Sequence, residues 1–322
     1  MKSVTSLVVL ATALVFSQFA AGPALAGEQK SILVTGASTG IGRNMTERLA
    51  KEGFFVYAGA RKANDLAELD AIDNVRGVRL DVTSQADVDA AVDFVRSEGR
   101  GLWALVNNAG VATQAPVAAV TDDEIDFVFG VNVTGVVRVT RAFIPLVSKS
   151  RGRIVTIGSI AGIRSGPRGS VYSMSKHAVE AFTDSLAAEM AEAGVQVSII
   201  EPGAYKSRIR RNAIARMTSD LEAAGGTVTD EMREWGKQLA ERELALDEPD
   251  DVSAALLHAV TADVALRRYL VTPNAEQADG TVRALVRELV ELNEWEQNGF
   301  SRDELVEMLD RELASPASLA SP

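Results

Sequence analysis

Short apolar runs rich in β-branched residues alternate with amphipathic helical stretches from residue 31 to residue 275. Strands that are apolar on both faces are typical of a parallel sheet, because the crossover helices between parallel strands cover both sides of it. The expected strands are residues 32–35, 55–59, 78–80, 102–107, 154–157, 195–200 and 269–271. No linker rich in Pro, Gly or Ser interrupts this alternation, so the pattern predicts a single-domain α/β fold with a doubly wound parallel sheet of about seven strands.

Composition excludes several classes of protein. The 322 residues include 44 Asp and Glu but only 33 Lys and Arg, a formal charge of −11 at pH 7. Because nucleic acid and anionic lipid surfaces attract basic proteins, nucleic acid is not expected as a partner. The sequence has no cysteine and two histidines, which excludes disulfides, thiolate nucleophiles and cysteine-bound zinc and argues against any metal site. An enzyme of this composition must use hydroxyls, amines, carboxylates or a bound cofactor.

Residues 1–26 have the pattern of a secretory signal peptide. Lys2 supplies the positive end, residues 7–20 are apolar apart from three polar residues, and Ala24-Leu25-Ala26 is a small-x-small cleavage site. The apolar stretch is shorter than the roughly 20 residues that span a bilayer, which favours cleavage over an uncleaved N-terminal anchor. The sequence therefore predicts export to the periplasm. A membrane-anchored or cytoplasmic protein is the alternative, with membrane contact only if the segment stays uncleaved.

Residues 27–292 form the predicted domain, and two segments depart from its alternation. Between residues 204 and 250 charged and helix-favouring residues follow a strand without forming another strand. Ligands bind beyond the carboxyl ends of strands in open α/β sheets, so we expect a helical substrate lid there, with a helical hairpin of no functional role as the alternative. Residues 293–322 are charged, contain few apolar residues and end in Ser and Pro, which predicts a weakly ordered tail.

A glycine-rich segment, Thr35-Gly36-Ala37-Ser38-Thr39-Gly40-Ile41-Gly42, follows the first predicted strand and opens a helix. Glycines at these positions allow positive φ and leave no Cβ in the way, so a pyrophosphate can approach the backbone N–H groups at a helix N-terminus. The spacing is Gly-x-x-x-Gly-x-Gly, which differs from the more common dinucleotide fingerprint Gly-x-Gly-x-x-Gly. The segment predicts a dinucleotide cofactor.

Further motifs follow in order over residues 31–207, and together with this loop they resemble the short-chain dehydrogenase/reductase (SDR) family. They are Asp81, Asn107-Asn108-Ala109-Gly110, Asn132, Ser159, Tyr172-x-x-x-Lys176 and Pro202-Gly203. The resemblance implies a Rossmann-type fold and NAD(P)-dependent chemistry on CH–OH groups. Longer stretches such as Ile-Glu-Pro-Gly at 200–203 look most like the subgroup of 17β-hydroxysteroid and retinol dehydrogenases, which act on lipophilic alcohols and ketones.

The resemblance implies four catalytic residues. Tyr172 would exchange a proton with the substrate oxygen while a hydride passes between the substrate and the nicotinamide, and Ser159 would orient that oxygen. Lys176 would bind the nicotinamide ribose, and Asn132 would hold a water that relays protons to it. Tyr172 and Lys176 lie one helical turn apart, so the ammonium should stabilise the phenolate and lower the Tyr172 pKa from its usual value of about 10. A non-catalytic NADP(H)-binding redox sensor or interaction protein is the alternative, and the intact catalytic set argues against it.

The resemblance also implies a set of cofactor-binding residues. They are Gly36, Ser38, Thr39, Gly40, Ile41, Gly42, Arg61, Asp81, Val82, Asn108, Ala109, Gly110, Tyr172, Lys176, Pro202, Gly203 and Ser207. Within this set, Asp81 would hold the adenine amino group, and Ser207 would hold the nicotinamide carboxamide.

The choice between NAD and NADP depends on the end of the second strand. NAD enzymes usually place an acid there for the ribose 2′-hydroxyl, whereas this chain has Arg61 and Lys62, which suit a 2′-phosphate. The sequence therefore favours NADP over NAD. Two observations weigh against this: Thr39 stands where many NADP members of the family carry a basic residue, and Arg61 could be an ordinary surface arginine.

The expected partners are a small-molecule alcohol or ketone and further copies of the chain. Helices containing residues 128–139 and 177–190 resemble those through which the family forms homodimers and homotetramers. The substrate itself stays open, because substrate choice resides in residues 204–250, the segment least similar to the family. Export is in tension with an NADP cofactor, since the periplasm has no obvious NADPH supply.

Overall fold

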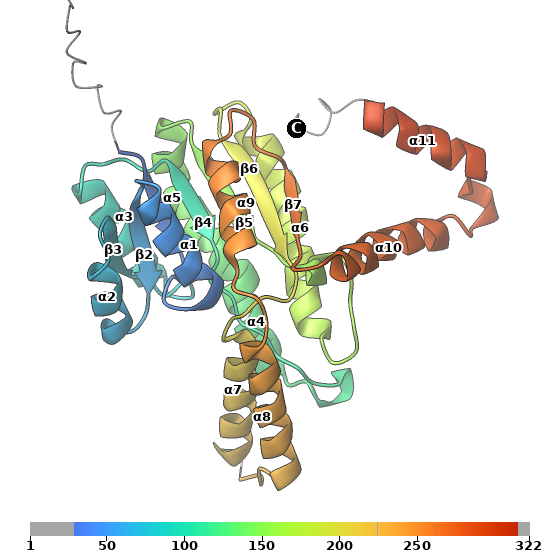
Figure 1. The fold of residues 1–322 in the computed structure, drawn as a ribbon, viewed down its shortest axis with the longest axis horizontal. Coiled ribbons are helices and arrows are strands. Elements are labelled where there is room, and N and C mark those ends of the chain that lie inside the picture. The colour runs from blue at the N-terminus through green and yellow to red at the C-terminus, as the bar shows by residue number, and fades with distance from the viewer. Residues whose placement is uncertain (1–28, 224, 315–322) are drawn as a thin grey trace, which may run out of the picture.

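The computed structural model describes residues 29–223 and 225–314. The predicted signal peptide lies outside these residues. Within them, one sheet with the strand order β3-β2-β1-β4-β5-β6-β7 forms the centre of the molecule (Figure 1). Its strands are β1 (Ser31–Val34), β2 (Phe55–Ala60), β3 (Val75–Arg79), β4 (Ala104–Asn107), β5 (Arg153–Ile157), β6 (Gln196–Pro202) and β7 (Arg268–Val271). All neighbouring strands are parallel, which confirms the predicted Rossmann-type fold.

The helices that surround the sheet are α1 (Gly40–Lys51), α2 (Ala63–Asp70), α3 (Gln85–Ser97), α4 (Asp122–Phe129), α5 (Val136–Lys149), α6 (Ser170–Met190), α7 (Ile209–Ala223), α8 (Asp230–Leu244), α9 (Asp250–Thr261), α10 (Ala275–Leu292) and α11 (Arg302–Ala314). A π-helical turn, Gly130–Gly135, joins α4 to α5, and short 3₁₀ turns lie at Val117–Ala119, Ile160–Gly162 and Glu296–Asn298.

Each face of the sheet has its own apolar core. Successive residues of a strand point to opposite faces, so Ile32 and Val34 of β1 pack with α1 and α9 on one side while Leu33 packs with α3, α5 and α6 on the other. Within the described residues, one helical stretch, Asp122–Lys149, is long and apolar enough to cross a membrane. Its residues Val139 and Phe143 are fully buried against the sheet, as in the core helix of a globular domain.

The strand order reverses between β1 and β4. The chain adds β2 and β3 on one side of β1, then returns to add β4 to β7 on the other side. At such a switch point the loops after the two central strands turn away from each other and leave a crevice beyond their carboxyl ends. The glycine-rich loop after β1 and the segment after β4 therefore meet at this point, which positions the site described below.

Helices α7 and α8 form a hairpin that projects beyond the carboxyl ends of the strands, where the sequence predicts the lid (Figure 1). Helices α10 and α11 extend away from the body on the side of β7 (Figure 1). Helix α11, which has no buried residue, lies within the segment 293–322 for which the composition predicts weak order, and that prediction stays untested. Val306, Leu309 and Leu313 recur at helical spacing there, a periodicity that the average composition of the tail hides.

Candidate active site

A cavity of about 840 Å³ opens at the carboxyl edge of the sheet, within the usual range for ligand sites. All seventeen residues expected to bind the cofactor line it, from Gly36 in the loop after β1 to Ser207 after β6. Ser159 lines it as well. Asn132, by contrast, lies behind the wall of the cavity and is 2% exposed. The structure therefore brings together residues that are distant in sequence, and only Asn132 of the predicted set does not face the cavity.

The glycine loop has the shape that a pyrophosphate requires. Gly36 and Gly40 have φ values of +65° and +57°, in the left-handed region that favours glycine. A Cβ on Gly36 would lie 2.8 Å from the Cα of Ala109, and one on Gly42 would collide with the Gly36 carbonyl and the Asn108 side chain. Thr39 makes no side-chain cap on α1, and the first turn of α1 carries no acidic residue. The N–H groups there remain available to a phosphate, so these residues fit a dinucleotide.

Hydrogen bonds join the glycine loop to the segment after β4. The Thr35 hydroxyl accepts from the backbone N–H groups of Asn108 and Ala109 at 2.9 and 3.0 Å. In return, the Asn108 amide donates to the carbonyls of Thr35 and Gly36 at 2.8 and 3.1 Å. The Asn108 side chain therefore holds the loop in place, while its backbone and the residues after it line the cavity.

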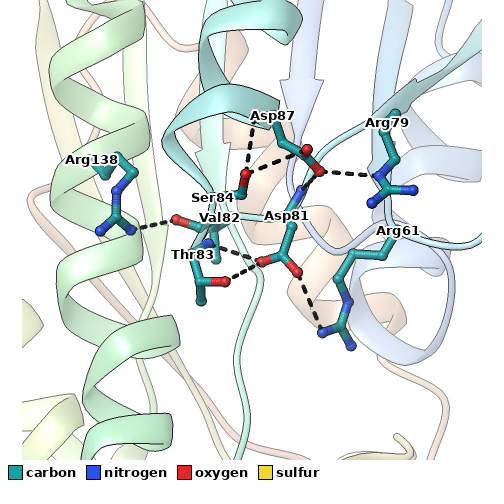
Figure 2. A network of polar contacts seen from close by, with 8 residues as sticks. All are labelled: Arg61, Arg79, Asp81, Val82, Thr83, Ser84, Asp87 and Arg138. Atoms are coloured by element: carbon teal, nitrogen blue, oxygen red, sulfur yellow. Dashed lines mark hydrogen bonds and ion pairs between the residues drawn. The ribbon is translucent and has the colours of Figure 1, made fainter.

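The end of the cavity where the sequence predicts the adenosine contains a charged network around Asp81 (Figure 2). One carboxylate oxygen of Asp81 accepts from the backbone N–H and hydroxyl of Thr83 at 2.9 and 2.7 Å, and the other lies 3.8 Å from the Arg61 guanidinium. Burial opposes ionisation, but the Thr83 hydrogen bonds together with the positive charges of Arg61 and Arg79 hold the pKa of Asp81 below its usual value. Arg61 is 60% exposed, so its pairing with Asp81 leaves the guanidinium accessible from the cavity.

The Asp81 loop is itself held rigidly. Asp87 accepts from the Asp81 N–H at 3.0 Å and from Arg79 at 3.1 Å, and Arg138 of α5 donates to the Val82 carbonyl at 2.7 Å (Figure 2). Asp81 and Val82 are therefore fixed at the positions where the sequence predicts the adenine.

The catalytic candidates meet where β5 ends and α6 begins. Ser159 caps the 3₁₀ turn after β5, and its hydroxyl accepts from the Ala161 N–H at 3.1 Å. Tyr172 and Lys176 lie one turn apart on α6, and the buried Lys176 ammonium donates to the Ile157 carbonyl at 2.8 Å. All three side chains line the same cavity as the glycine loop.

Asn132 lies outside the cavity and contacts the catalytic helix segment through Ser175. It lies in the π-helical turn, where its side chain accepts from the Val111 N–H at 2.8 Å and donates to the Val111 carbonyl and the Ser175 hydroxyl, both at 2.9 Å. Both amide hydrogens are thus engaged, and the side chain joins the segment after β4 to α6 next to Lys176. Its role in a water relay stays a prediction.

The pKa of Tyr172 shifts in the opposite direction to the one expected from its spacing to Lys176. Burial raises the pKa of the Tyr172 phenol, against the Ser159 hydrogen bond and the positive charge of Arg210, which lower it. The Lys176 ammonium points to the Ile157 carbonyl and lies 5.8 Å from the centre of the tyrosine ring. Burial also lowers the pKa of Lys176 to about 8, against the negative charge of Glu180. Loss of water around the charged forms is therefore the largest influence on both pKa values.

Two carboxyl groups lie close together at α6 and the neighbouring strand β6. Glu180, one turn after Lys176 on α6, and the 2% exposed Glu201 of β6 both lie near the Arg268 guanidinium, at 3.4 and 3.6 Å. Among the described residues, neither oxygen of Glu180 has a hydrogen-bond donor. Burial and the neighbouring Glu201 raise the pKa of Glu180 to about 8, and burial raises that of Glu201 as well. A proton on one carboxyl lets it donate to the other, so the pair holds a proton near neutral pH.

Sequence reasoning missed further polar residues that line the cavity, one of them in the lid. Glu243 of α8 is 3% exposed and accepts from the Ser207 hydroxyl and the Arg210 N–H, both at 3.2 Å. Arg164 and Gln277 line the cavity from the loop after β5 and from α10. No local pattern marks these residues, because a charged residue on a helix is usually solvated, and only the packing of the hairpin turns Glu243 inward.

Comparisons with known proteins agree with this geometry. A family model described as short chain dehydrogenase matches residues 30–218. The mitochondrial D-beta-hydroxybutyrate dehydrogenase of Bos taurus is 34% identical over 264 residues, which cover 74% of this chain and 76% of that protein. Retinol dehydrogenase 7 of Rattus norvegicus is 35% identical over 212 residues, 64% of this chain and 66% of that protein.

Solved structures agree as well. A short chain dehydrogenase/reductase from Burkholderia phymatum in complex with NAD has a TM-score of 0.69 and 28% identity, and it covers 82% of this chain and 95% of its own. Fold and site define a dinucleotide-binding protein of Rossmann type. More specifically, the chain belongs to the short-chain dehydrogenase family, as its motifs predict, and is an oxidoreductase.

The carboxyl pair predicts a pH-dependent stability. Between about pH 5 and pH 8 folded Glu180, with its pKa of about 8, retains a proton that the unfolded chain has released. The free energy of unfolding should therefore decrease as the pH rises through this window, and Glu180→Gln should remove part of that decrease. Urea denaturation followed by circular dichroism measures both.

The exposed glutamate of the same helix, Glu189, provides the matched control, Glu189→Gln. Its pH profile should follow that of the wild type. If Glu180→Gln follows the wild-type profile too, the carboxyl pair holds no extra proton in the folded state.

Proposed function

We propose that the chain is an NADP-dependent oxidoreductase that transfers a hydride between the nicotinamide and a secondary alcohol or ketone. The observation that carries this proposal is that Ser159, Tyr172 and Lys176 line one cavity with a glycine loop shaped for a dinucleotide. The named relatives are dehydrogenases of a hydroxy acid and of a retinoid alcohol, which supports a substrate with a CH–OH group. The subgroup resemblance adds the expectation that the substrate is lipophilic.

Each catalytic side chain has one task in this proposal. When bound, the nicotinamide cofactor supplies or accepts the hydride. In the reductive direction the Tyr172 phenol gives its proton to the substrate oxygen, and the Ser159 hydroxyl orients that oxygen. Lys176, with a pKa of about 8, is an ammonium at neutral pH and stabilises the phenolate that remains. Asn132 positions Lys176 through Ser175.

The preference for NADP depends on Arg61. It lines the adenosine end of the cavity with Lys62, and its guanidinium suits a 2′-phosphate. The solved relative from Burkholderia phymatum is in complex with NAD, so in this proposal the residues around Arg61 account for the preference for NADP. Asp65 and Asp81 line the same end, and a bound phosphate would compete with Asp81 for the Arg61 guanidinium.

Replacement of Tyr172 tests the catalytic step. Tyr172→Phe should lower turnover of a ketone by at least about a hundredfold, the usual contribution of a general acid, and leave nucleotide binding unchanged. Tyr57→Phe is the matched control, because the Tyr57 hydroxyl is buried away from the cavity and has no hydrogen-bond partner among the described residues. Steady-state kinetics with a panel of ketones measure turnover. Unchanged turnover in Tyr172→Phe would refute the mechanism, and nucleotide binding without any wild-type turnover would favour a non-catalytic binding protein.

Fluorescence titrations with NADPH and NADH test the cofactor. The wild type should bind NADPH at least about tenfold more tightly, or about 1.4 kcal/mol. Arg61→Gln should lose this preference by weakening NADPH binding alone. Arg79→Gln is the control, since Arg79 pairs with Asp87 in the same network but does not line the cavity (Figure 2). A wild type that prefers NADH, or equal effects of the two variants, would show that Arg61 does not bind the phosphate.

We also propose a homodimer or homotetramer and export after cleavage at Ala26. The helices expected at the interface expose apolar side chains, among them Val137 of α5 and Met174 of α6, at 39% and 55%. A monomer in light scattering would refute assembly.

N-terminal sequencing of the chain from fractionated cells tests export, and an intact N-terminus in the cytosol would refute it.

A further inference from the structure

The half of the cavity beyond Tyr172 has an excess of positive charge. Apart from Lys176, the charged residues that line it are Arg164 of the loop after β5, Arg208 and Arg210 at the start of α7, and Glu243 of α8. Three arginines and one glutamate thus line this part of the cavity, in a chain whose formal charge is −11. Because the protein as a whole is negative, this local excess of positive side chains points to a negatively charged ligand.

Glu243 does not neutralise these arginines through direct pairing. One oxygen of its carboxylate accepts from the Ser207 hydroxyl and the Arg210 backbone N–H, and the other accepts from the Arg211 N–H at 3.4 Å. The carboxylate is thus engaged with the amino end of α7. Over residues 29–223 and 225–314, the guanidiniums of Arg164, Arg208 and Arg210 form neither an ion pair nor a side-chain hydrogen bond.

Arg210 lines the cavity together with Tyr172, and its positive charge lowers the pKa of Tyr172, against burial. The backbone of Arg208 lies beside Gly40, with its N atom 3.8 Å from the position of a Cβ there, on the cofactor side. The Arg164 guanidinium lies against α10, 3.2 Å from the position of a Cβ on Gly280. Arg210 is half-buried in the first turn of α7, where the bonds of Glu243 hold its backbone.

We propose that Arg210 binds a carboxylate of the substrate and thereby selects hydroxy acids and their oxo acids. The proposal rests on the proposed function and adds a substrate class to it. A guanidinium offers two parallel N–H donors that match the two oxygens of a carboxylate. In the reductive direction the carbonyl carbon of the oxo acid gains the hydride and its oxygen gains the Tyr172 proton, while the carboxylate stays unchanged. Ile209 and Leu246 line the same half of the cavity and leave room for an apolar chain on the acid.

Pairs of substrates that differ only in charge test this role. Straight-chain α-, β- and γ-oxo acids are compared with their methyl esters in steady-state kinetics with NADPH and NADH. In the wild type kcat/KM should be higher for one class of acid than for its ester. Arg210→Gln removes the charge that lowers the pKa of Tyr172, so it should change kcat/KM for acid and ester alike to some extent. Beyond that shared change, kcat/KM for the acid should fall at least about tenfold more than for its ester, as expected for loss of a hydrogen bond between charged groups.

Arg211→Gln is the matched control. The Arg211 N–H is bonded to the same Glu243, but its side chain lines a separate cavity between α7 and α8, with Met232 and Val228. This variant should leave kcat/KM for acid and ester unchanged. Arg210→Lys keeps the charge without the two-donor geometry, so it should restore part of the preference for the acid.

The outcomes separate this proposal from the proposed function. Equal turnover of acids and esters by the wild type, or equal effects of Arg210→Gln and Arg211→Gln, would overturn the role of Arg210 and leave the oxidoreductase proposal intact. If no compound is turned over, the nucleotide-bound chain is titrated with the same acids and esters, with the nucleotide fluorescence as the readout. Acid binding that Arg210→Gln abolishes supports the role of Arg210, and no acid binding overturns it. A chain that binds neither NADPH nor NADH refutes the proposed function itself.

Discussion

The hydrogen bonds between Thr35 at the end of β1 and Asn108 after β4 hold the site together. They cross the point where the strand order reverses, so they join two segments that the sheet itself does not connect beyond the strand ends. A buried hydrogen bond of this kind contributes roughly 1 kcal/mol net, and losing one partner costs more, because the other is left unpaired. Gly36 is part of the same constraint, since any Cβ there would push the two loops apart.

Helix α6 connects this edge of the sheet with the protein interior. Tyr172, Lys176 and Glu180 succeed one another at single-turn spacing, from the cavity to the carboxyl pair under the helix. Along this line burial moves each pKa away from its usual value, upward for Tyr172 and Glu180 and downward for Lys176. The environment thus favours the neutral form of all three groups. The charges of Arg210 at one end and Arg268 at the other act against that tendency.

The Glu243 carboxylate links the two helices of the lid to the loop after β6. It accepts hydrogen bonds from the Ser207 hydroxyl and from the Arg210 and Arg211 N–H groups in the first turn of α7. This contact also fixes the backbone from which Arg210 reaches the cavity. An anionic substrate would meet a guanidinium whose backbone is already held, and so would lose less freedom on binding than with a mobile side chain.

The sequence by itself determined the class of fold, the order of the strands along the chain and the motif residues that line the cavity. These follow from local rules: strands buried on both faces are apolar throughout, and the glycine loop and the Tyr172-x-x-x-Lys176 spacing are readable within a few residues. Helix α11 also has apolar residues at helical spacing, a local periodicity that the average composition of the tail does not show.

Only the tertiary structure decided the orientation of the polar and charged side chains and the direction in which their pKa values shift. Asn132 faces Val111 and Ser175 rather than the cavity, the pKa of Tyr172 rises rather than falls, and Glu243 turns inward to bond Ser207. None of these features could be derived from spacing, because burial and pairing depend on groups brought together from distant parts of the chain. The loss of water on burial can also reverse the pKa shift that a charged neighbour one turn away would cause.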